Sequence, residues 1–404
     1  MNISTNKKTF RPFQAVLLVF SLIGLIIAPW LLKADDQPAP KPIDLTQASL
    51  RSVPESINPI NVNQSLLLVA PLNGPLSLLG EESRRGAELA LRSLGAGFNL
   101  EQANEEERVE TQVPNLKDVK AVLGHFSEKS LTRNAPYYIH YDIPTILPYL
   151  ENPEVSSLNE NFYRLMPDYA TQGRRLAQEV LSQSKKPTQV VILVGPERPQ
   201  RLLADAFANA LSQGLTIPPS GQNKSPKKLA PLSSKIKVHR FDLTIVGELS
   251  ALADLKGGSQ DFVLLALPPN LALEAGPVLA TSKFAKSRYL AGGSLALREV
   301  GAEYRALNLI LTLCLPVIPA PKNNVYATFM RRYQYFTKNS PTWPAILAYD
   351  AANMAIKAAS IGNVKEYLRD PDRPHQGLAT SYVLNKGAPP QLLKIGDDNL
   401  SFLP

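Results

Sequence analysis

The chain has 404 residues, 44% of them apolar, which allows one large domain or two to three average ones and is enough for a sizeable core. Its formal net charge is +8, but residues 1–33 carry +4 and residues 216–240 carry +6, so the remaining residues together carry −2. The body of the protein therefore has no broad basic face for phosphates, and we do not expect it to bind nucleic acid.

The N-terminal segment predicts a helix that targets the chain to a membrane or anchors it there. Lys7, Lys8 and Arg11 precede an uncharged run, residues 12–32, which as a helix is roughly one bilayer thick. This placement of positive charge puts the first residues in the cytoplasm and the chain after the run outside. Two interpretations stay open. Residues 32–34 form a signal-peptide cleavage site, or residues 1–33 are a retained anchor, which the length of the run favours.

Two polar segments that contain proline predict extended or loop structure. Between residues 34 and 64, prolines at positions 38, 40, 42, 54 and 59 prevent a continuous helix and indicate a linker between the membrane and the folded part. Residues 218–234 are rich in Pro, Ser, Lys and Gly and predict a surface loop. This loop is either a solvated insertion or a contact with anionic lipid or cell-wall polymer.

From residue 65 onward, short apolar runs alternate with amphipathic segments. The apolar runs predict buried strands, and the 3.6-residue periodicity predicts helices. We expect strands at residues 65–71, 119–124, 144–148, 189–195, 235–241, 261–267 and 287–291. We expect helices at residues 81–94, 130–139, 172–184, 200–213, 247–255, 270–282, 325–336 and 343–359. Two successive sets of strand–helix units indicate an α/β protein with two Rossmann-like lobes, each a parallel sheet covered by helices.

Motifs of enzymes, cofactor sites and metal sites are absent from the sequence. It contains no P-loop, no complete glycine fingerprint for dinucleotides and no GxSxG. Residues 182–185 fit SxxK, but the partner motifs SDN and KTG are missing. The single cysteine, Cys314, predicts a buried apolar thiol, and the four histidines lack the spacing of metal ligands. The acidic run at residues 101–110 predicts a solvated loop. We therefore expect no enzyme, cofactor or metal.

Several segments, taken in their order along the chain, resemble the periplasmic leucine/isoleucine/valine-binding proteins of ABC transporters. They are LLLVAPLNGPLSLLGEESRRGAELAL (66–91), VLGHFS and APYYIHYDIPTILP (within 122–148), NFYRLMPDYATQGRRLA (161–177), DFVLLALPPNLALEAGPVLA (261–280) and AILAYDAANMAIKAA (345–359). The resemblance implies a type I periplasmic-binding fold, in which two lobes joined by three crossovers close on a ligand. Lobe 1 would comprise residues 65–166 and 313–376, and lobe 2 residues 167–312 and 377–404.

The resemblance also implies a ligand site between the lobes, but the first-lobe positions depart from the family pattern. In the family, hydroxyl side chains and backbone N–H groups at a helix N-terminus hold a ligand carboxylate. The matching positions here are Leu79, Ser127, Glu128, Tyr149, Leu150 and Glu151. Glu128 and Glu151 stand where small or hydroxyl residues are expected, and a carboxylate there repels a ligand carboxylate.

The second-lobe positions depart from the pattern as well. The family has an aspartate and a tyrosine–glycine pair after the strand at 189–195, whereas this chain has Pro-Glu-Arg-Pro up to Gln200. Pro268 replaces an expected aromatic residue, and Gly293 stands near the position of the acid that holds the ligand ammonium. The framework is thus kept while the amino-acid clamp is lost.

Three explanations of this loss are open. The site holds a different, cationic ligand through Glu128 and Glu151; it holds no ligand and the lobes bind a protein partner; or the equivalent positions lie one to three residues away in these loops. The simpler interpretation of Glu128 and Glu151 is that both are exposed loop carboxylates without a role in binding.

The resemblance implies the substrate-binding component of an ABC transporter for amino acids or related small polar ligands, working outside the cytoplasm with a permease. The alternative is a non-transport scaffold of the same fold that binds a cell-envelope protein. A third hypothesis is the sensor ectodomain of a signalling protein. It is disfavoured because about a dozen cytoplasmic residues are too few for an output domain.

Overall fold

The computed structural model describes residues 64–94, 97–183, 188–214, 236–320, 322–362, 364–370 and 373–404. The expected anchor at 12–32, nearly all of the linker at 34–64 and the basic loop at 218–234 lie outside the described residues. Within the ranges given above, none of the helices has both the length and the apolar character needed to cross a bilayer.

The first sheet, sheet A, has five parallel strands in the spatial order β2-β1-β3-β4-β5. These strands are β1 (Gln64–Ala70), β2 (Phe98–Asn104), β3 (Val119–Gly124), β4 (Thr145–Leu147) and β5 (Phe162–Arg164). Strand β1 has a neighbour on each side; its residues Leu66 and Leu68 belong to one apolar cluster, and Leu67 and Val69 belong to another. Because both faces of β1 are buried, its sequence is a continuous apolar run.

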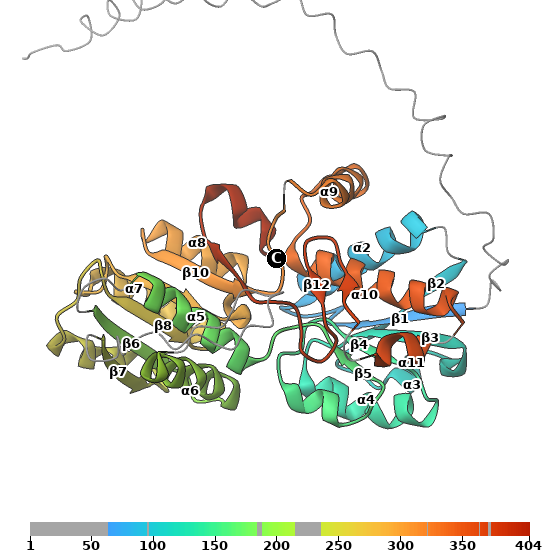
Figure 1. The fold of residues 1–404 in the computed structure, drawn as a ribbon, viewed down its shortest axis with the longest axis horizontal. Coiled ribbons are helices and arrows are strands. Elements are labelled where there is room, and N and C mark those ends of the chain that lie inside the picture. The colour runs from blue at the N-terminus through green and yellow to red at the C-terminus, as the bar shows by residue number, and fades with distance from the viewer. Residues whose placement is uncertain are drawn as a thin grey trace, which may run out of the picture. The chain divides into compact units, whose positions relative to one another are not determined.

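Helices α2 (Ser77–Leu94) and α10 (Trp343–Ser360) cover one face of sheet A, and α4 (Glu128–His140) covers the other (Figure 1). Helices α2 and α10 pack closely at Gly86, where an added Cβ atom would lie 2.0 Å from the carbonyl oxygen of Ala345. The smaller elements around this sheet are α3 (Val109–Gln112), α9 (Asn324–Thr337), α11 (Val364–Arg369), β11 (His375–Gln376), β12 (Ser381–Tyr382), η1 (Leu116–Asp118) and η2 (Pro153–Ser157).

The second sheet, sheet B, has the spatial order β13-β10-β9-β8-β6-β7. Its strands are β6 (Thr188–Val194), β7 (Ile236–Asp242), β8 (Phe262–Ala266), β9 (Arg288–Ala291), β10 (Ile310–Leu315) and β13 (Gln391–Lys394). All its pairings are parallel except that of β10 with β13. Cys314 on β10 is fully buried, and burial raises the pKa of its thiol, as expected for an apolar core cysteine.

Sheet B is also covered on both faces. Helices α5 (Tyr169–Gln183) and α6 (Arg198–Gln213) pack on one face, and α7 (Pro269–Thr281) and α8 (Arg298–Ala306) contact the cluster on the other. The remaining elements are the 3-10 helices η4 (Val246–Asp254), η5 (Gly293–Leu295) and η6 (Asp397–Phe402). The chain thus passes from sheet A to sheet B after β5, returns after β10, and reaches sheet B again at β13.

Most expected elements are present, with differences at two places. The expectation of a solvated loop at 101–110 was wrong, because residues 101–104 belong to β2, an edge strand that pairs only with β1 and carries polar side chains such as Gln102 on its exposed positions. The segment expected as a helix at 247–255 is the 3-10 helix η4.

The boundaries of the lobes are also not where the sequence placed them. Strand β10 runs through Leu315, three residues past the expected boundary between residues 312 and 313. The backbone N–H of Ala388 still donates to Leu165 next to β5 (2.9 Å), so contacts with sheet A extend beyond residue 376.

Candidate ligand site

The loops that follow β3 and β4 meet at the carboxyl ends of these strands, as is expected for neighbouring parallel strands. Glu128 is the first residue of α4, and its Oε2 accepts a hydrogen bond from Nδ2 of Asn152 (3.0 Å). The ring of Phe126 stacks on that of Tyr149, with 3.8 Å between the ring centroids. The segments 126–128 and 149–152 are therefore adjacent.

Four of the first-lobe residues singled out from the sequence are engaged in structural contacts. The Oγ of Ser127 accepts a hydrogen bond from the N–H of Ser130 (3.2 Å) and caps α4. The Oη of Tyr149 lies 2.7 Å from Oγ of Ser83 and 3.2 Å from the carbonyl oxygen of Pro344. Leu79 on α2 is buried, and Leu150 is buried in the apolar cluster that also contains Leu67 and Val69. These contacts indicate folding roles for the four side chains.

Glu151 is different, because it is a carboxylate that is only 8% exposed. Burial raises its pKa to about 7, and hydrogen bonding by Gln172 and the charge of Arg164 act in the opposite direction. A Cβ atom placed on Gly293 would lie 2.6 Å from Oε1 of Glu151. The structure therefore brings Glu151 from the sheet A side against the loop after β9 of sheet B. The expectation that Glu151 is an exposed loop carboxylate was wrong.

Gln172 fixes the sheet B side of this contact. Its Oε1 accepts a hydrogen bond from the N–H of Gly293 (2.9 Å), and its Nε2 donates to the carbonyl oxygen of Pro167 (3.0 Å). Gln172 is fully buried in α5. Because Gly293 has no side chain, the Glu151 carboxylate can approach the backbone at this point.

Arg164, at the end of β5, is buried but does not neutralise Glu151 directly. Its guanidinium donates to the carbonyl oxygens of Met166 and Asn385, and burial lowers its pKa. The ion pairs within 4.0 Å found among the described residues do not join Arg164 to Glu151. The guanidinium of Arg164 therefore mainly joins its own segment to that of Asn385, which is 221 residues away in the sequence.

A second group of polar residues comes from the start of α6. Nε2 of Gln200 donates to Oε2 of Glu197 (3.0 Å), and Oε1 of Gln200 is buried without a hydrogen-bond partner. Arg198 forms an ion pair with Glu154 of η2, with 2.9 Å between Nη1 and Oε2. This exposed ion pair connects an element of sheet A with one of sheet B.

Tyr169 connects the two groups of residues. Burial raises the pKa of its phenol, the negative charges of Glu151, Glu128 and Glu197 raise it further, and the positive charge of Arg164 lowers it. The pKa of this phenol is thus affected by carboxylates from both sheets and by one guanidinium. Pro268 precedes α7 and lies beside this group, because a Cβ atom placed on Gly195 would be 2.7 Å from Cδ of Pro268 and 3.4 Å from Cγ of Gln200.

Sequence reasoning missed Glu105, which follows β2 and is 3% exposed. Its Oε2 accepts hydrogen bonds from the backbone N–H groups of Phe126 (3.0 Å) and Ser127 (3.2 Å). Burial raises the pKa of Glu105, and these two hydrogen bonds lower it. The acidic run in which it lies gave no signal for this burial, since the partner N–H groups are more than 20 residues away in the sequence.

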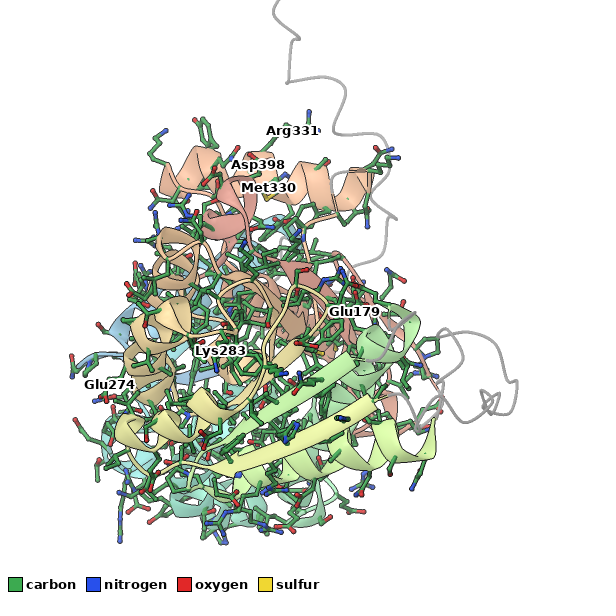
Figure 2. All side chains as sticks on the ribbon, turned by 90° about the vertical axis from the view of Figure 1, so that its left-hand side faces the viewer. Glu179, Glu274, Lys283, Met330, Arg331 and Asp398 are labelled. Atoms are coloured by element: carbon green, nitrogen blue, oxygen red, sulfur yellow. The ribbon has the colours of Figure 1, made fainter. Side chains whose placement is uncertain are left out.

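The structure also has hollows beside α9. Volumes of 240 and 340 Å³ lie toward α2 and α10, and one of 630 Å³ lies toward η6. Met330, Arg331 and Asp398, which line the largest of the three, are labelled in Figure 2. The apolar side chains of Val325, Tyr335 and Phe336 on α9 are exposed, and Val325 and Phe336 line the hollows toward α2 and α10. Among the described residues, no group of three or more His, Cys, Asp and Glu side chains is arranged to hold a metal ion.

Comparison with solved structures identifies the fold. A leucine-binding protein from Thermotoga maritima matches with a TM-score of 0.60 and 16% sequence identity, over 83% of this chain and 99% of that protein. An ABC transporter substrate-binding protein from Desulfitobacterium hafniense, in complex with leucine, matches with a TM-score of 0.63 and 17% identity, over 83% and 98%. An ABC transporter solute-binding protein from R. palustris, in complex with benzoate, matches with a TM-score of 0.59 and 15% identity, over 82% and 93%.

No family model and no curated protein match the sequence. Identities of 15–17% establish a shared fold and not a shared ligand. The chain therefore has the two-lobed fold of branched-chain amino acid and related solute-binding proteins, as the segments from residue 66 to 359 predicted.

Proposed function

We propose that this protein is an extracytoplasmic solute-binding component of an ABC uptake system, and that the site between its two sheets binds a small ligand with a cationic group. The observation that carries the proposal is Glu151, a buried carboxylate that reaches the loop of the opposite sheet at Gly293. The fold supports the mechanism of binding, in which two lobes close on a solute without covalent chemistry.

The charge of the site favours a cationic ligand. The negative charges of Glu128, Glu151 and Glu197 act on Tyr169 against one positive charge, that of Arg164, whose guanidinium donates to backbone carbonyl oxygens. The buried Oε1 of Gln200 is an additional acceptor without a donor. A buried carboxylate that lacks a cation partner costs free energy, which here appears as the raised pKa of Glu151. An ammonium or guanidinium group between the sheets would offset that cost and donate hydrogen bonds to the free acceptors.

The relatives by fold support a small ligand, because two of them were solved in complex with leucine and with benzoate. We place the folded part outside the cytoplasm because of the positive residues and apolar run at positions 7–32, with the segment as a retained anchor or a cleaved signal. A permease would accept the ligand at the membrane surface.

The proposal is tested by ligand-induced shifts in melting temperature, followed by calorimetry. We expect small amines and guanidines to raise the melting temperature, while sugars and carboxylic acids without an amine do not. Glu151→Gln keeps the size of the side chain but removes its charge, and we expect it to weaken amine binding at least tenfold. Glu274→Gln, an exposed position on α7, is the matched control and should bind as the wild type does.

Failure of all amines to bind, or equal binding by the Glu151→Gln variant, would overturn the proposal. A second candidate function would then be favoured by the exposed apolar face of α9 and the hollows that flank it, which suit a partner protein. In that case the protein would be a scaffold, and an envelope protein should copurify with it and be lost on Tyr335→Ala.

A further inference from the structure

We infer that Glu105 is a built-in anion that makes the proposed site select amines without a carboxylate over amino acids. The inference rests on the proposed function and names the class of ligand more closely. In this arrangement the protein itself supplies the carboxylate that an amino acid would bring to the N-terminal end of α4.

Glu105 is held in place by its backbone as well as by its side chain. Its N–H donates to the carbonyl oxygen of Ala70 at the end of β1 (3.0 Å), and its carbonyl oxygen accepts from Oγ of Ser130 in α4 (2.8 Å). The side chain then turns toward the loop before α4, where Oε2 meets the N–H groups of Phe126 and Ser127. The position of the carboxylate is therefore fixed by three neighbouring elements.

The N–H groups that Glu105 occupies lie at the end of α4 that would attract an external anion. Backbone N–H groups at the start of a helix lack partners inside the helix, and the helix dipole adds positive potential there. The N–H groups of Phe126 and Ser127 donate to Glu105, and that of Ser130 donates to Ser127. A ligand carboxylate at this end of α4 would thus find three donors already in use.

The carboxylates at this end of α4 act in the same direction, against the positive side chain of Arg133, which donates to the carbonyl oxygen of Glu105 (3.4 Å). Glu128 lies in the first turn of α4, next to the loop that Glu105 binds, and is joined through Asn152 to the segment that contains Glu151. A ligand carboxylate at this end of the helix would approach Glu105 and Glu128 together, and like charges in a partly buried site repel strongly. An ammonium group at the same place would be attracted by both carboxylates.

The test uses probes that differ only at the carboxylate: 3-methylbutylamine, leucinamide and leucine. By calorimetry, we expect the wild type to bind the amine and the amide at least tenfold more tightly than leucine. Glu105→Ala frees the two N–H groups and removes a negative charge, so leucine affinity should rise at least tenfold and the preference should disappear. Glu105→Gln keeps the size of the side chain and should reduce the preference partly, which separates a charge effect from a change in loop structure.

Glu106→Ala is the control, because this adjacent glutamate is exposed and should leave the preference unchanged. If the amine binds in a manner that depends on Glu151 but both Glu105 variants keep the wild-type preference, the inference about Glu105 is wrong while the proposed function stands. Wild-type protein that binds leucine as tightly as the amine would also contradict the inference. If none of the three probes binds, the inference fails, while the proposed function fails only if the wider series of amines and guanidines also gives no binding.

Discussion

Two buried acids, Glu151 and Asp350, have pKa values raised to about 7, in each case mainly by burial. Asp350 in α10 accepts hydrogen bonds from Oη of Tyr382 (2.8 Å) and from the N–H of Leu378 (2.9 Å), so its partners are all within the protein. Glu151 has the side chain of Gln172 as its hydrogen-bonding neighbour and lies against Gly293 of the opposite sheet. The same raised pKa therefore occurs in two settings: Asp350 is held by donors around one sheet, whereas Glu151 lies where the two sheets meet.

The two acids should make the protein less stable as the pH rises from about 5 to 7. Their ordinary pKa values are 4.5 and 3.8, so in this window the unfolded chain has released protons that the folded protein still holds. The free energy of unfolding then falls with pH, by at most about 1.4 kcal/mol per pH unit for each acid. We expect Glu151→Gln and Asp350→Asn each to flatten this dependence, measured by denaturant unfolding at pH 5, 6 and 7.

Glu274→Gln is the control for these measurements, because this exposed side chain should leave the dependence as it is in the wild type. A wild-type stability that rises from pH 5 to 7, with no difference in the Glu151→Gln variant, would show that Glu151 is ionised and paired in the folded protein.

At the scale of elements, the contact between α2 and α10 determines how closely two distant parts of the chain can approach over sheet A. Gly86 makes this approach possible, because the backbone of α10 at Ala345 takes the space in which a side chain would lie. The two residues are far apart in the sequence, so a pattern search within α2 shows only a glycine in an otherwise good helix. The structure supplies the reason for that glycine.

Gly86→Ala should therefore destabilise the protein although alanine favours helices. The added Cβ atom would lie 2.0 Å from a backbone oxygen, so the two helices must separate, at a cost of about 1–3 kcal/mol or more. Gly247→Ala is the matched control, since the added Cβ atom would meet only the side-chain carbon Cδ1 of Ile245, at 3.9 Å, and the substitution should be neutral or slightly stabilising. Equal melting temperatures for wild type and Gly86→Ala would show that α10 can move away freely.

At the scale of the whole molecule, the continuous apolar runs were enough to predict two sets of parallel strands, because strands buried on both faces carry that pattern. Strand β2 was missed because it pairs on one side only and keeps polar residues such as Glu101. The meeting of Glu128 with the segment of Glu151 could be predicted, since the ends of neighbouring parallel strands adjoin. The burial of Glu105 and Arg164 could not, because it depends on backbone groups contributed by distant segments.

A series of aromatic rings connects the proposed site with a contact between the lobes. Phe126 stacks on Tyr149, and Tyr149 lies edge-on to Trp343 with 6.2 Å between the ring centroids. Nε1 of Trp343, on the sheet A side, donates to the carbonyl oxygen of Ala296 on the sheet B side (3.0 Å). A change at the loop of Phe126 should therefore reach the indole, which is only 7% exposed.

Trp343 should thus report on ligand binding by the whole molecule. The chain has two tryptophans, so in a Trp30→Phe background the fluorescence comes from Trp343 alone. We expect 3-methylbutylamine to change the emission of Trp343 in proportion to the heat measured by calorimetry, because closure of the lobes alters the hydrogen bond to Ala296 and the contact with Tyr149. Adding Trp343→Phe should abolish the signal while binding heat remains. Binding heat without any change in emission would mean that the ligand binds without moving one lobe against the other.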